Sequence, residues 1–293
     1  MRALVVLVHY FSPEANPRHT SVDESRRENR TQAIQTVIQG WRGLFGTSTK
    51  LRFADRSLDL LPASVDLDIR VLTVPGCSLV SEDFRRTYGV WETAASPQNP
   101  RMLGFSAYQV FAKLAADYDW FILSEDDLLV RDPLFFDKLC WFNATFGDQR
   151  VLSPNRLEWN PAARRLKTYV DGDISQATFT QLTRNLPDAD TLRARPLHGE
   201  VTFQRARNPH SGFLAITKAQ LSHWMAQPHW LDYDVSFVSP LESAATLGVT
   251  KTFPVYKPLA PHAFLEVEHL DDRFSKMPWP IHALDQTSTG MTL

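Results

Sequence analysis

The uninterrupted apolar run at residues 3–8, rich in β-branched side chains, constrains the fold more than any other feature of the sequence. A strand that is apolar on both faces has to be covered on both faces, which is typical of a central strand in a parallel sheet. Two further strands are predicted at residues 67–74 and 120–123, and apolar residues at helical spacing fill residues 34–45 and 104–116 between them. This alternation predicts an α/β fold with a mostly parallel central sheet flanked by helices.

The second half of the chain has a less regular pattern. Residues 160–177 are polar and predict a loop, whereas residues 200–204 and 212–217 predict two strands that pair around a turn at 208–211. Further short elements are predicted, namely strands at 150–153 and 250–255 and helices at 218–225 and 240–247. We therefore expect an irregular half that packs against the sheet.

The composition excludes several classes of protein. Lys and Arg number 31 and Asp and Glu number 33, a formal net charge of −2, which gives no electrostatic basis for binding nucleic acid. The most apolar run, residues 3–8, falls far short of the roughly 20 residues that cross a bilayer, so we expect no transmembrane segment. That run also lacks the length and cleavage site of a signal peptide, which favours a cytoplasmic protein. The only cysteines, Cys77 and Cys140, exclude a disulfide scaffold and a four-cysteine zinc site, and we expect two buried free thiols.

An acidic triplet, Glu125-Asp126-Asp127, directly follows the predicted strand at 120–123. Three adjacent carboxylates repel one another, and a bound cation would relieve that repulsion. Alternation along a strand allows Glu125 and Asp127 to point one way and Asp126 the other. Oxygen ligands of this kind suit Mg²⁺ or Mn²⁺, which also accept phosphate oxygens from a substrate. A solvated strand end, or a helix N-terminus capped by Asp127, is the alternative. The position at the carboxyl end of a sheet strand, where α/β sheets bind ligands, favours the metal site.

An apolar strand that runs into an acidic D-x-D-like triplet, after a βαβ half, resembles the GT-A-fold glycosyltransferases. The resemblance covers about residues 1–270, although E-D-D stands here where D-x-D is usual. It implies a nucleotide-diphosphate sugar as donor and Mn²⁺ or Mg²⁺ on its diphosphate. It also implies that Asp127 is the direct metal ligand, that Glu125 contacts metal or ribose, and that Asp126 lies in the donor site. The implied organisation is a nucleotide-sugar-binding half (1–135), an acceptor-binding half of the same compact unit (136–282) and a flexible tail (283–293).

The resemblance assigns roles to residues elsewhere in the chain. Tyr10 and Phe11 follow the first strand and could stack on a nucleobase, or they could be core residues that end a buried strand. Gly212 would let the backbone approach the donor sugar closely, or it could belong to a plain hairpin turn. A late histidine, His262 with His269 as the alternate, would join the metal. Arginines that could pair with phosphate oxygens are Arg26, Arg27, Arg30, Arg101, Arg205 and Arg207.

The resemblance also implies a carboxylate base at the start of a helix, which takes the proton of the attacking acceptor hydroxyl. Glu242 lies in the first turn of the helix predicted after Pro240, where the helix N-terminus stabilises its anion. A first-turn Glu is equally ordinary helix chemistry. Asp234 and Asp232, in the loop before this helix, are the fallback bases. Glu242 as base implies inversion at the anomeric carbon.

The hypothesis is a metal-dependent glycosyltransferase of the hexosyltransferase type. It would move a sugar to a hydroxyl of a glycan or lipid-linked acceptor, in polysaccharide biosynthesis at the cytoplasmic face of the membrane, with peripheral membrane contact only. The sequence has no G-x-x-x-x-G-K-[ST] loop, no G-x-G-x-x-G after the first strand and no G-x-S-x-G elbow. A metal-dependent phosphoester or diphosphate hydrolase and a non-catalytic sugar-nucleotide or glycan-binding module are the alternatives.

Overall fold

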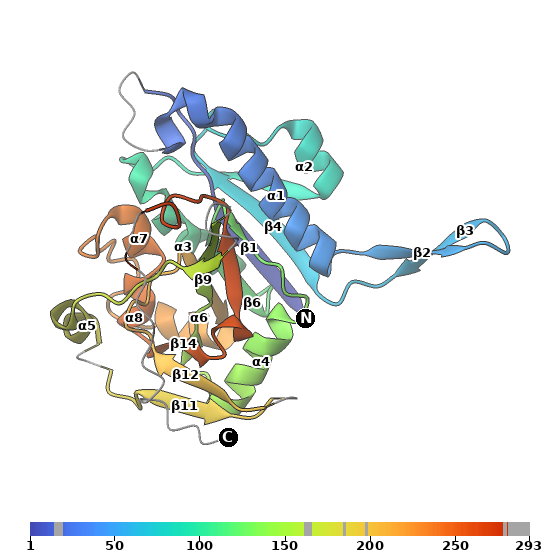
Figure 1. Ribbon diagram of the computed structural model, residues 1–293. Coiled ribbons are helices and arrows are strands. Elements are labelled where there is room, and N and C mark those ends of the chain that lie inside the picture. Colours follow the sequence, from blue (N-terminus) through green and yellow to red (C-terminus); the bar gives the residue numbers. More distant parts are fainter. Residues whose placement is uncertain (15–19, 161–165, 184–185, 197–198, 278–279, 281–293) are drawn as a thin grey trace.

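The computed structural model describes residues 1–14, 20–160, 166–183, 186–196, 199–277 and 280, and its centre is a five-stranded sheet in the order β13-β6-β1-β4-β5 (Figure 1). The five strands are β1 (Arg2–Val8), β4 (Asp66–Thr73), β5 (Val90–Ala94), β6 (Trp120–Glu125) and β13 (Phe213–Thr217). All neighbouring pairs are parallel except β13, which runs antiparallel to β6. The predicted fold class, α/β with a mostly parallel sheet flanked by helices, is confirmed.

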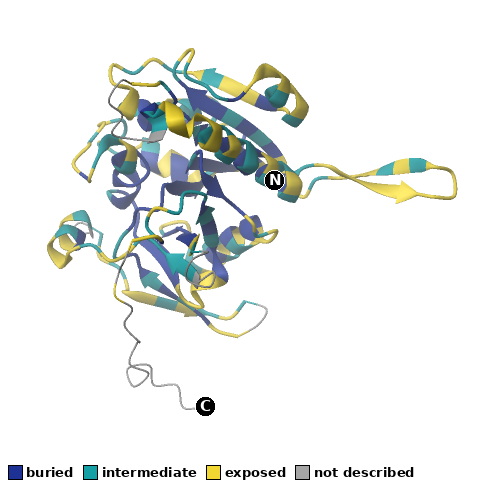
Figure 2. Cartoon of the chain, turned by 45° about the horizontal axis from the view of Figure 1, so that its top comes forward, coloured by how far each residue is buried: buried dark blue, intermediate teal, exposed yellow. Residues whose placement is uncertain are grey.

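Strand β1 shows why the run at residues 3–8 has to lie in the middle of the molecule. Ala3, Val5 and Leu7 face one hydrophobic cluster, and Leu4 and Val6 face another. Helices α1 (Arg27–Phe45) and α4 (Phe135–Phe146) cover the first face, whereas α3 (Leu103–Leu114) and α6 (Lys218–Met225) cover the second. The sheet is therefore the middle of three layers. Strands β1, β6 and β13 are almost entirely buried (Figure 2), whereas the edge strand β5 is mostly exposed.

The first cluster joins both halves of the chain through Trp41 of α1. Its indole is 0% exposed and lies edge-on to Phe135 of α4, with ring centres 5.9 Å apart. It also stacks on Phe213 of β13, with ring centres 6.5 Å apart. Burial of large aromatic side chains contributes strongly to folding, so Trp41 holds the second half of the chain against the first.

Two smaller sheets carry the remaining strands. One has the order β10-β9-β15-β7, with β7 (Leu128–Leu129), β9 (Asn155–Asn160), β10 (Leu166–Tyr169) and β15 (Glu266–His269). The other has the order β11-β12-β14-β8, with β8 (Val151–Leu152), β11 (Thr191–Ala194), β12 (Val201–Arg205) and β14 (Val255–Ala260). The remaining helices are α2 (Glu82–Tyr88), α5 (Gln176–Thr183), α7 (Pro240–Ala244) and α8 (Leu247–Thr250), with short 3-10 turns at Thr20–Val22, Glu24–Arg26, Pro100–Met102 and His262–Phe264.

The predicted pairing of residues 200–204 with 212–217 is wrong. Both segments are strands, but β12 pairs with β11 and β14, whereas β13 pairs with β6. The burial patterns give the reason, because β12 alternates between buried and half-buried residues while β13 is buried on both faces. A strand that is apolar on both faces belongs in the central sheet.

Other boundaries also differ from the predictions. The strand expected at 250–255 begins at Val255, because α8 extends through Thr250. The loop expected at 160–177 contains β10 and the start of α5. The tail at 283–293 lies outside the described residues. Cys77 and Cys140 are free thiols, as expected, but the expected burial is wrong, because Cys77 is half-buried and Cys140 is exposed. Among the helices that the structure describes, none has both the length and the apolar character needed to cross a membrane.

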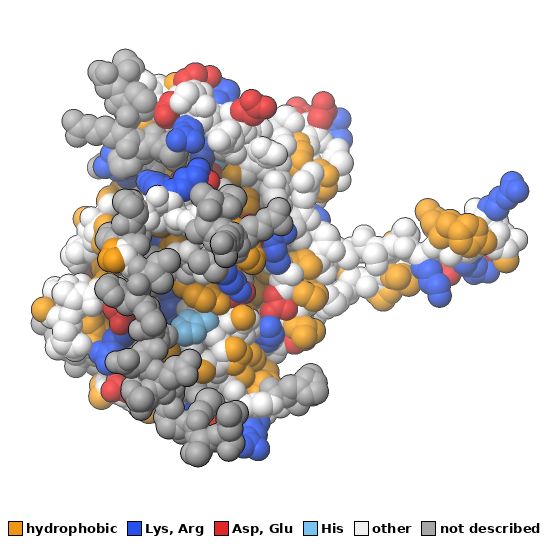
Figure 3. Space-filling model, in the orientation of Figure 1, with side chains coloured by type: hydrophobic (Ala, Val, Ile, Leu, Met, Phe, Trp, Pro, Cys, Tyr) orange, Lys and Arg blue, Asp and Glu red, His pale blue; other side chains and the backbone are white. Residues whose placement is uncertain are grey.

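A hairpin of β2 (Ser48–Arg52) and β3 (Ser57–Leu61) projects as an arm from the body between α1 and β4 (Figure 1). Phe53 near its tip is 86% exposed, and Leu58 and Leu60 are exposed beside it. Hydrophobic, Lys and Arg side chains therefore share this surface (Figure 3). The arm leaves the amino end of β4, the end opposite to the acidic triplet, which follows the carboxyl end of the parallel strand β6.

Trp41→Ala should lower the free energy of unfolding by about 3–5 kcal/mol, because it removes a fully buried aromatic side chain and leaves a cavity. Trp91→Ala is the matched control, since Trp91 is 64% exposed on β5, and it should change stability by less than about 0.5 kcal/mol. Urea denaturation of both variants measures the difference. Equal losses in the two would contradict the role given to Trp41.

Candidate functional site

The acidic triplet lies where β6 ends, at the carboxyl edge of the parallel strands and beside the antiparallel strand β13. Glu125 is the last residue of β6 and pairs with Val8 at the end of β1. Asp126 and Asp127 follow in the turn that leads to β7. Both aspartates are buried, although their carboxylates would be fully hydrated in the unfolded chain. Buried carboxylates require partners, and the structure supplies them from elements far apart in the sequence.

Asp126 has two partners, one on each side. Its Oδ2 accepts a hydrogen bond from Nδ1 of His9, 2.5 Å away, and its Oδ1 accepts one from Arg30. The backbone N–H of Leu79 donates to Nε2 of His9 (2.9 Å), so Nδ1 of a neutral His9 carries the proton. Burial raises the pKa of Asp126, but Arg30 and His9 outweigh it and hold that pKa below its ordinary value. Asp126 is therefore an ionised internal anchor.

Asp127 is only partly partnered. Nη1 of Arg30 donates to its Oδ2 (2.8 Å), and Nε2 of His269 lies 3.7 Å from the same oxygen. Its Oδ1 is buried and has no hydrogen-bond partner among the described residues. A buried carboxylate oxygen without a partner is uncommon, and it marks a position where a cation or a donor group fits.

His269 is oriented by a second carboxylate behind it. Strand β15 pairs with β7, which places His269 opposite Leu128, the residue after Asp127. Nδ1 of His269 lies 2.7 Å from Oε1 of the fully buried Glu158, whose other oxygen accepts the N–H of Ser275 (2.7 Å). Burial lowers the pKa of His269, but Glu158 and Asp127 outweigh it, so the pKa is raised above its ordinary value. A carboxylate on one ring nitrogen turns the other nitrogen toward Asp127, as it does in many metal sites.

Glu125 points away from Arg30 and toward the turn before β13. A Cβ atom on Gly212, whose φ is +63°, would lie 2.6 Å from the Glu125 carboxylate, so only glycine fits there. Nη1 of Arg156 lies 3.7 Å from the same carboxylate. Burial raises the pKa of Glu125, and the charge of Asp127 raises it further to about 7, against the charges of Arg156 and His269. The carboxylate of Glu125 therefore lies directly against the backbone of Gly212.

A buried row of charges continues from Glu125 into the second half. Arg156 of β9 pairs with Asp171 (2.8 Å), which also binds Lys257 of β14 (2.9 Å). Nζ of Lys257 donates to the carbonyl of His210 (2.7 Å) and so fixes the turn before Gly212. Burial and the charge of Arg156 lower the pKa of His210 to about 3, so this imidazole is neutral near pH 7. The row ties the position of Glu125 to the fold of the second half.

Sequence reasoning missed several members of this site. These residues are His9, Arg156, Glu158, Asp171, His210 and Lys257. One signal was available on β9, where the charged residues Arg156 and Glu158 lie within a strand. Charged side chains are buried only when they are paired, so such residues indicate buried ion pairs. Their partners are too far away in the chain for a local pattern to identify.

Three of the predicted binding residues differ in how far they are buried, and for Phe11 the structure favours the alternative of a core residue that ends a buried strand. Phe11 is 3% exposed, and the guanidinium of Arg27 lies 4.7 Å from the centre of its ring, so both faces of the ring are covered. Tyr10 is half-buried at the rim of the second hydrophobic cluster. His262 is exposed, with its ring 5.1 Å from that of Tyr169. The structure thus brings His269, the alternate, beside Asp127.

The two predicted bases lie in the second half of the chain. Glu242 is in the first turn of α7, as predicted, and its carboxylate accepts a hydrogen bond from Ser239. Asp234 pairs with Lys251 (2.6 Å) and lines a cavity of about 280 Å³. The other residues that line this cavity include Gln181, His229, Ser236 and Thr250. Leu182, Leu186 and Leu247 also line it, so the cavity offers charged and hydroxyl groups beside an apolar surface.

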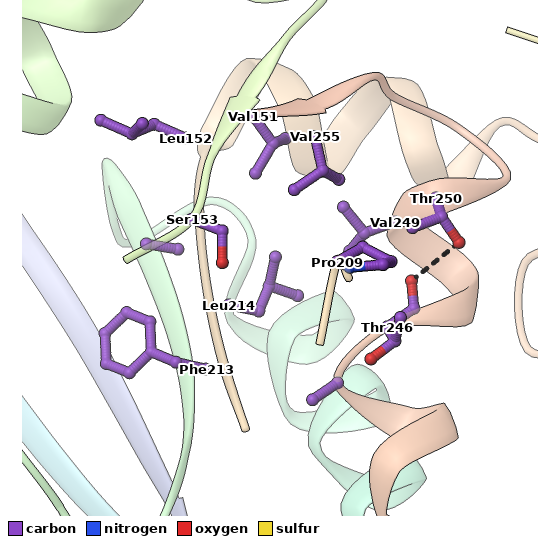
Figure 4. A pocket seen from close by; sticks show the side chains of 12 residues that line it. Val151, Leu152, Ser153, Pro209, Phe213, Leu214, Thr246, Val249, Thr250 and Val255 are labelled. Carbon is purple, nitrogen blue, oxygen red and sulfur yellow. Dashed lines mark hydrogen bonds between the residues drawn. The ribbon is translucent and has the colours of Figure 1, made fainter. Parts of the chain in front are cut away.

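A second cavity lies beside the turn that carries Gly212. Its lining side chains come from Pro209 and Phe213 at the two sides of the turn, from β8 and from α8 (Figure 4). The volume is about 10 Å³, which holds one water molecule at most. This cavity is therefore no substrate pocket.

A divalent cation fits the partly satisfied Asp127. Among the residues that the structure describes, no three His, Cys, Asp or Glu side chains are grouped closely enough to hold a metal by themselves. Asp127 and His269 supply two ligand groups, and the unpartnered Oδ1 supplies a free oxygen. Mg²⁺ and Mn²⁺ bound with nucleotides use few protein ligands and complete their shells with phosphate oxygens and water, so this donor set fits such an ion.

The fold and the site define the class as an α/β protein with a carboxylate-rich edge suited to a metal and an anionic ligand. No protein-family model and no curated protein matches the chain. Among solved structures, glucosyl-3-phosphoglycerate synthase from Mycobacterium tuberculosis is similar at 15% identity, with a TM-score of 0.37, over 74% of this chain. A second structure of that synthase, in complex with Mn²⁺, uridine-diphosphate and glucosyl-3-phosphoglycerate, is similar at 14% identity with a TM-score of 0.36. This chain spans 57% of the length of each, and its activity is argued below from the site alone.

Glu125→Gln should change how stability depends on pH in metal-free buffer. The folded protein keeps a proton on Glu125 up to a pKa of about 7, whereas the unfolded chain loses it near 4.5. The free energy of unfolding should therefore fall as the pH rises from 4.5 to 7, by at most about 3 kcal/mol. Urea denaturation across this range should show a shallower fall for Glu125→Gln. Glu82→Gln, at an exposed position of α2, should keep the wild-type dependence, and equal slopes in all three proteins would contradict the burial of Glu125.

Proposed function

We propose that this protein is a metal-dependent glycosyltransferase that moves a sugar from a nucleotide-diphosphate sugar to a hydroxyl group. The unpartnered Oδ1 of Asp127, with Nε2 of His269 turned toward the same carboxylate, is the observation that carries the proposal. Asp127 and His269 would hold Mn²⁺ or Mg²⁺, with Glu125 beside them. When bound, the cation would neutralise the charge that develops on the departing diphosphate.

The donor would lie across the carboxyl edge of the sheet. Tyr10, half-buried just after β1, would be the aromatic side chain that contacts the nucleobase, and the buried Phe11 follows it in the chain. The turn from His210 to Gly212 would face the sugar, since Lys257 and Glu125 hold it on two sides. A turn with fixed backbone groups can orient a substrate without reorganisation.

The acceptor would bind in the second half, where Glu242 would take the proton of the attacking hydroxyl. The hydrogen bond from Ser239 orients the carboxylate, and α7 begins at Pro240 beside it. The cavity that contains Asp234 and Lys251 offers a polar surface for a hydroxyl-rich acceptor, a glycan or a lipid-linked glycan. We infer inversion from Glu242 as base, and a place in polysaccharide biosynthesis at the cytoplasmic face of a membrane.

A thermal-shift panel tests the donor and the metal together. UDP, GDP, CMP, ADP and their common sugars are each added with Mn²⁺ or with EDTA. One nucleoside diphosphate should raise the unfolding midpoint, since a ligand at a hundredfold excess over its Kd stabilises by about 2.7 kcal/mol, and EDTA should abolish the shift. Asp127→Asn should lose the shift, whereas Asp59→Asn on the hairpin arm should keep it. No shift with any nucleotide would overturn the proposal.

Glu242→Gln tests the base. The loss of a general base lowers kcat by roughly 10²–10⁴-fold while donor binding stays unchanged. Transfer from the donor found in the thermal panel is measured by product analysis, with Glu82→Gln as the surface control. Full turnover in Glu242→Gln would refute this role. Release of free sugar alone, whatever acceptor is offered, would identify a hydrolase instead.

A further inference from the structure

Arg30 occupies an unusual position for a residue of an outer helix. It stands early in α1, yet its side chain is largely buried and reaches the end of β6. There it contacts Asp127, which is 97 residues away from Arg30 in the chain. Its two terminal nitrogens each donate to a different carboxylate, Nη1 to Asp127 and Nη2 to Asp126. Its Nε is buried without a hydrogen-bond partner among the described residues. Within the described part of the chain, the guanidinium is therefore held by the two aspartates alone.

The two aspartates depend on Arg30 to different degrees. Asp126 keeps His9 as a second partner, so its carboxylate stays anchored if the guanidinium moves. Among the described residues, Arg30 is the only side chain that donates a hydrogen bond to the Asp127 carboxylate. The next group, Nε2 of His269, lies 3.7 Å away. Arg30 thus supplies to Asp127 the positive charge that a metal ion would also supply.

We propose that Arg30 couples the binding of the divalent cation to the binding of a diphosphate. A metal ion that binds Asp127 by itself meets the fixed positive charge of the guanidinium on the same carboxylate, and the two cations repel each other. A diphosphate brings enough negative charge for both cations. The guanidinium fork matches phosphate oxygens as well as it matches carboxylates, so Arg30 can turn from Asp127 to the diphosphate.

The coupling has a direct consequence for the order of binding. The free protein binds bare metal weakly, and the metal–diphosphate complex binds tightly as a unit. The diphosphate part of this inference rests on the proposed function, whereas the competition between Arg30 and bare metal does not. The two parts can therefore fail separately.

Arg30→Gln tests the competition, because it removes the charge and keeps a side chain of comparable polarity. Titration calorimetry with Mn²⁺ alone should show at least tenfold tighter binding than in the wild type. With saturating Mn²⁺, inorganic pyrophosphate should bind at least tenfold more weakly. Arg86→Gln, which removes the same charge from the exposed face of α2, should leave both affinities unchanged. These changes of opposite sign distinguish coupling from a structural role, which would weaken both.

Two further variants keep the inference testable if Arg30→Gln does not fold. Arg30→Lys keeps the positive charge and should bind bare Mn²⁺ as weakly as the wild type. Arg30→Gln combined with Asp126→Asn removes one charge of each sign and should still bind bare Mn²⁺ more tightly. Unchanged Mn²⁺ affinity in the folded variants would overturn the inference even if nucleotide sugars bind. Tighter Mn²⁺ binding without any nucleotide binding by the wild type would uphold the competition and refute the proposed function.

Discussion

The burial of adjacent carboxylates at the end of β6 is the constraint that the rest of the site satisfies. A buried carboxylate without a partner is costly, and removal of one partner from a buried ion pair costs roughly 3–5 kcal/mol. Asp126, Asp127 and Glu125 therefore each need a positive or hydrogen-bonding group from another element. Arg30 of α1 and Arg156 of β9 meet this need from opposite sides. The triplet is stable only when both halves of the chain have folded around it.

The partners divide the triplet into parts with different chemistry. Asp126 is fully hydrogen-bonded and stays ionised, Asp127 keeps a free oxygen, and Glu125 is close to half-protonated near pH 7. Three consecutive carboxylates thus take three different roles: Asp126 is an anchor, Asp127 has a free oxygen for a ligand, and Glu125 is a group with a raised pKa. Lys257 extends the same network to the carbonyl of His210, so charge pairing also fixes the turn that lies against Glu125. Environment, more than residue type, assigns these roles.

Local patterns predicted the strands of the central sheet and the helices beside it well, because an apolar run or a helical spacing of apolar residues can be recognised within a single segment. The strand at residues 3–8, the helix at 218–225 and the strand that ends in the triplet are all observed. The actual partners of these two strands, β11 and β14 for β12 and β6 for β13, could not be predicted, since a local pattern identifies a strand but not the sheet that receives it. The sequence favoured His262, with His269 as the alternate, and only the pairing of β15 with β7 places His269 beside Asp127.

The sequence by itself determined that an apolar strand ends in three carboxylates at the carboxyl edge of a parallel sheet. This follows from residue types and spacing within a few residues, which govern local structure and its direction. Only the tertiary structure decided which cations meet those carboxylates, because Arg30 and Asp127 are 97 residues apart and Glu158 and His269 are 111 residues apart. The attraction between two charges depends on their separation in space, and these groups come close together only when the layers of the folded chain pack.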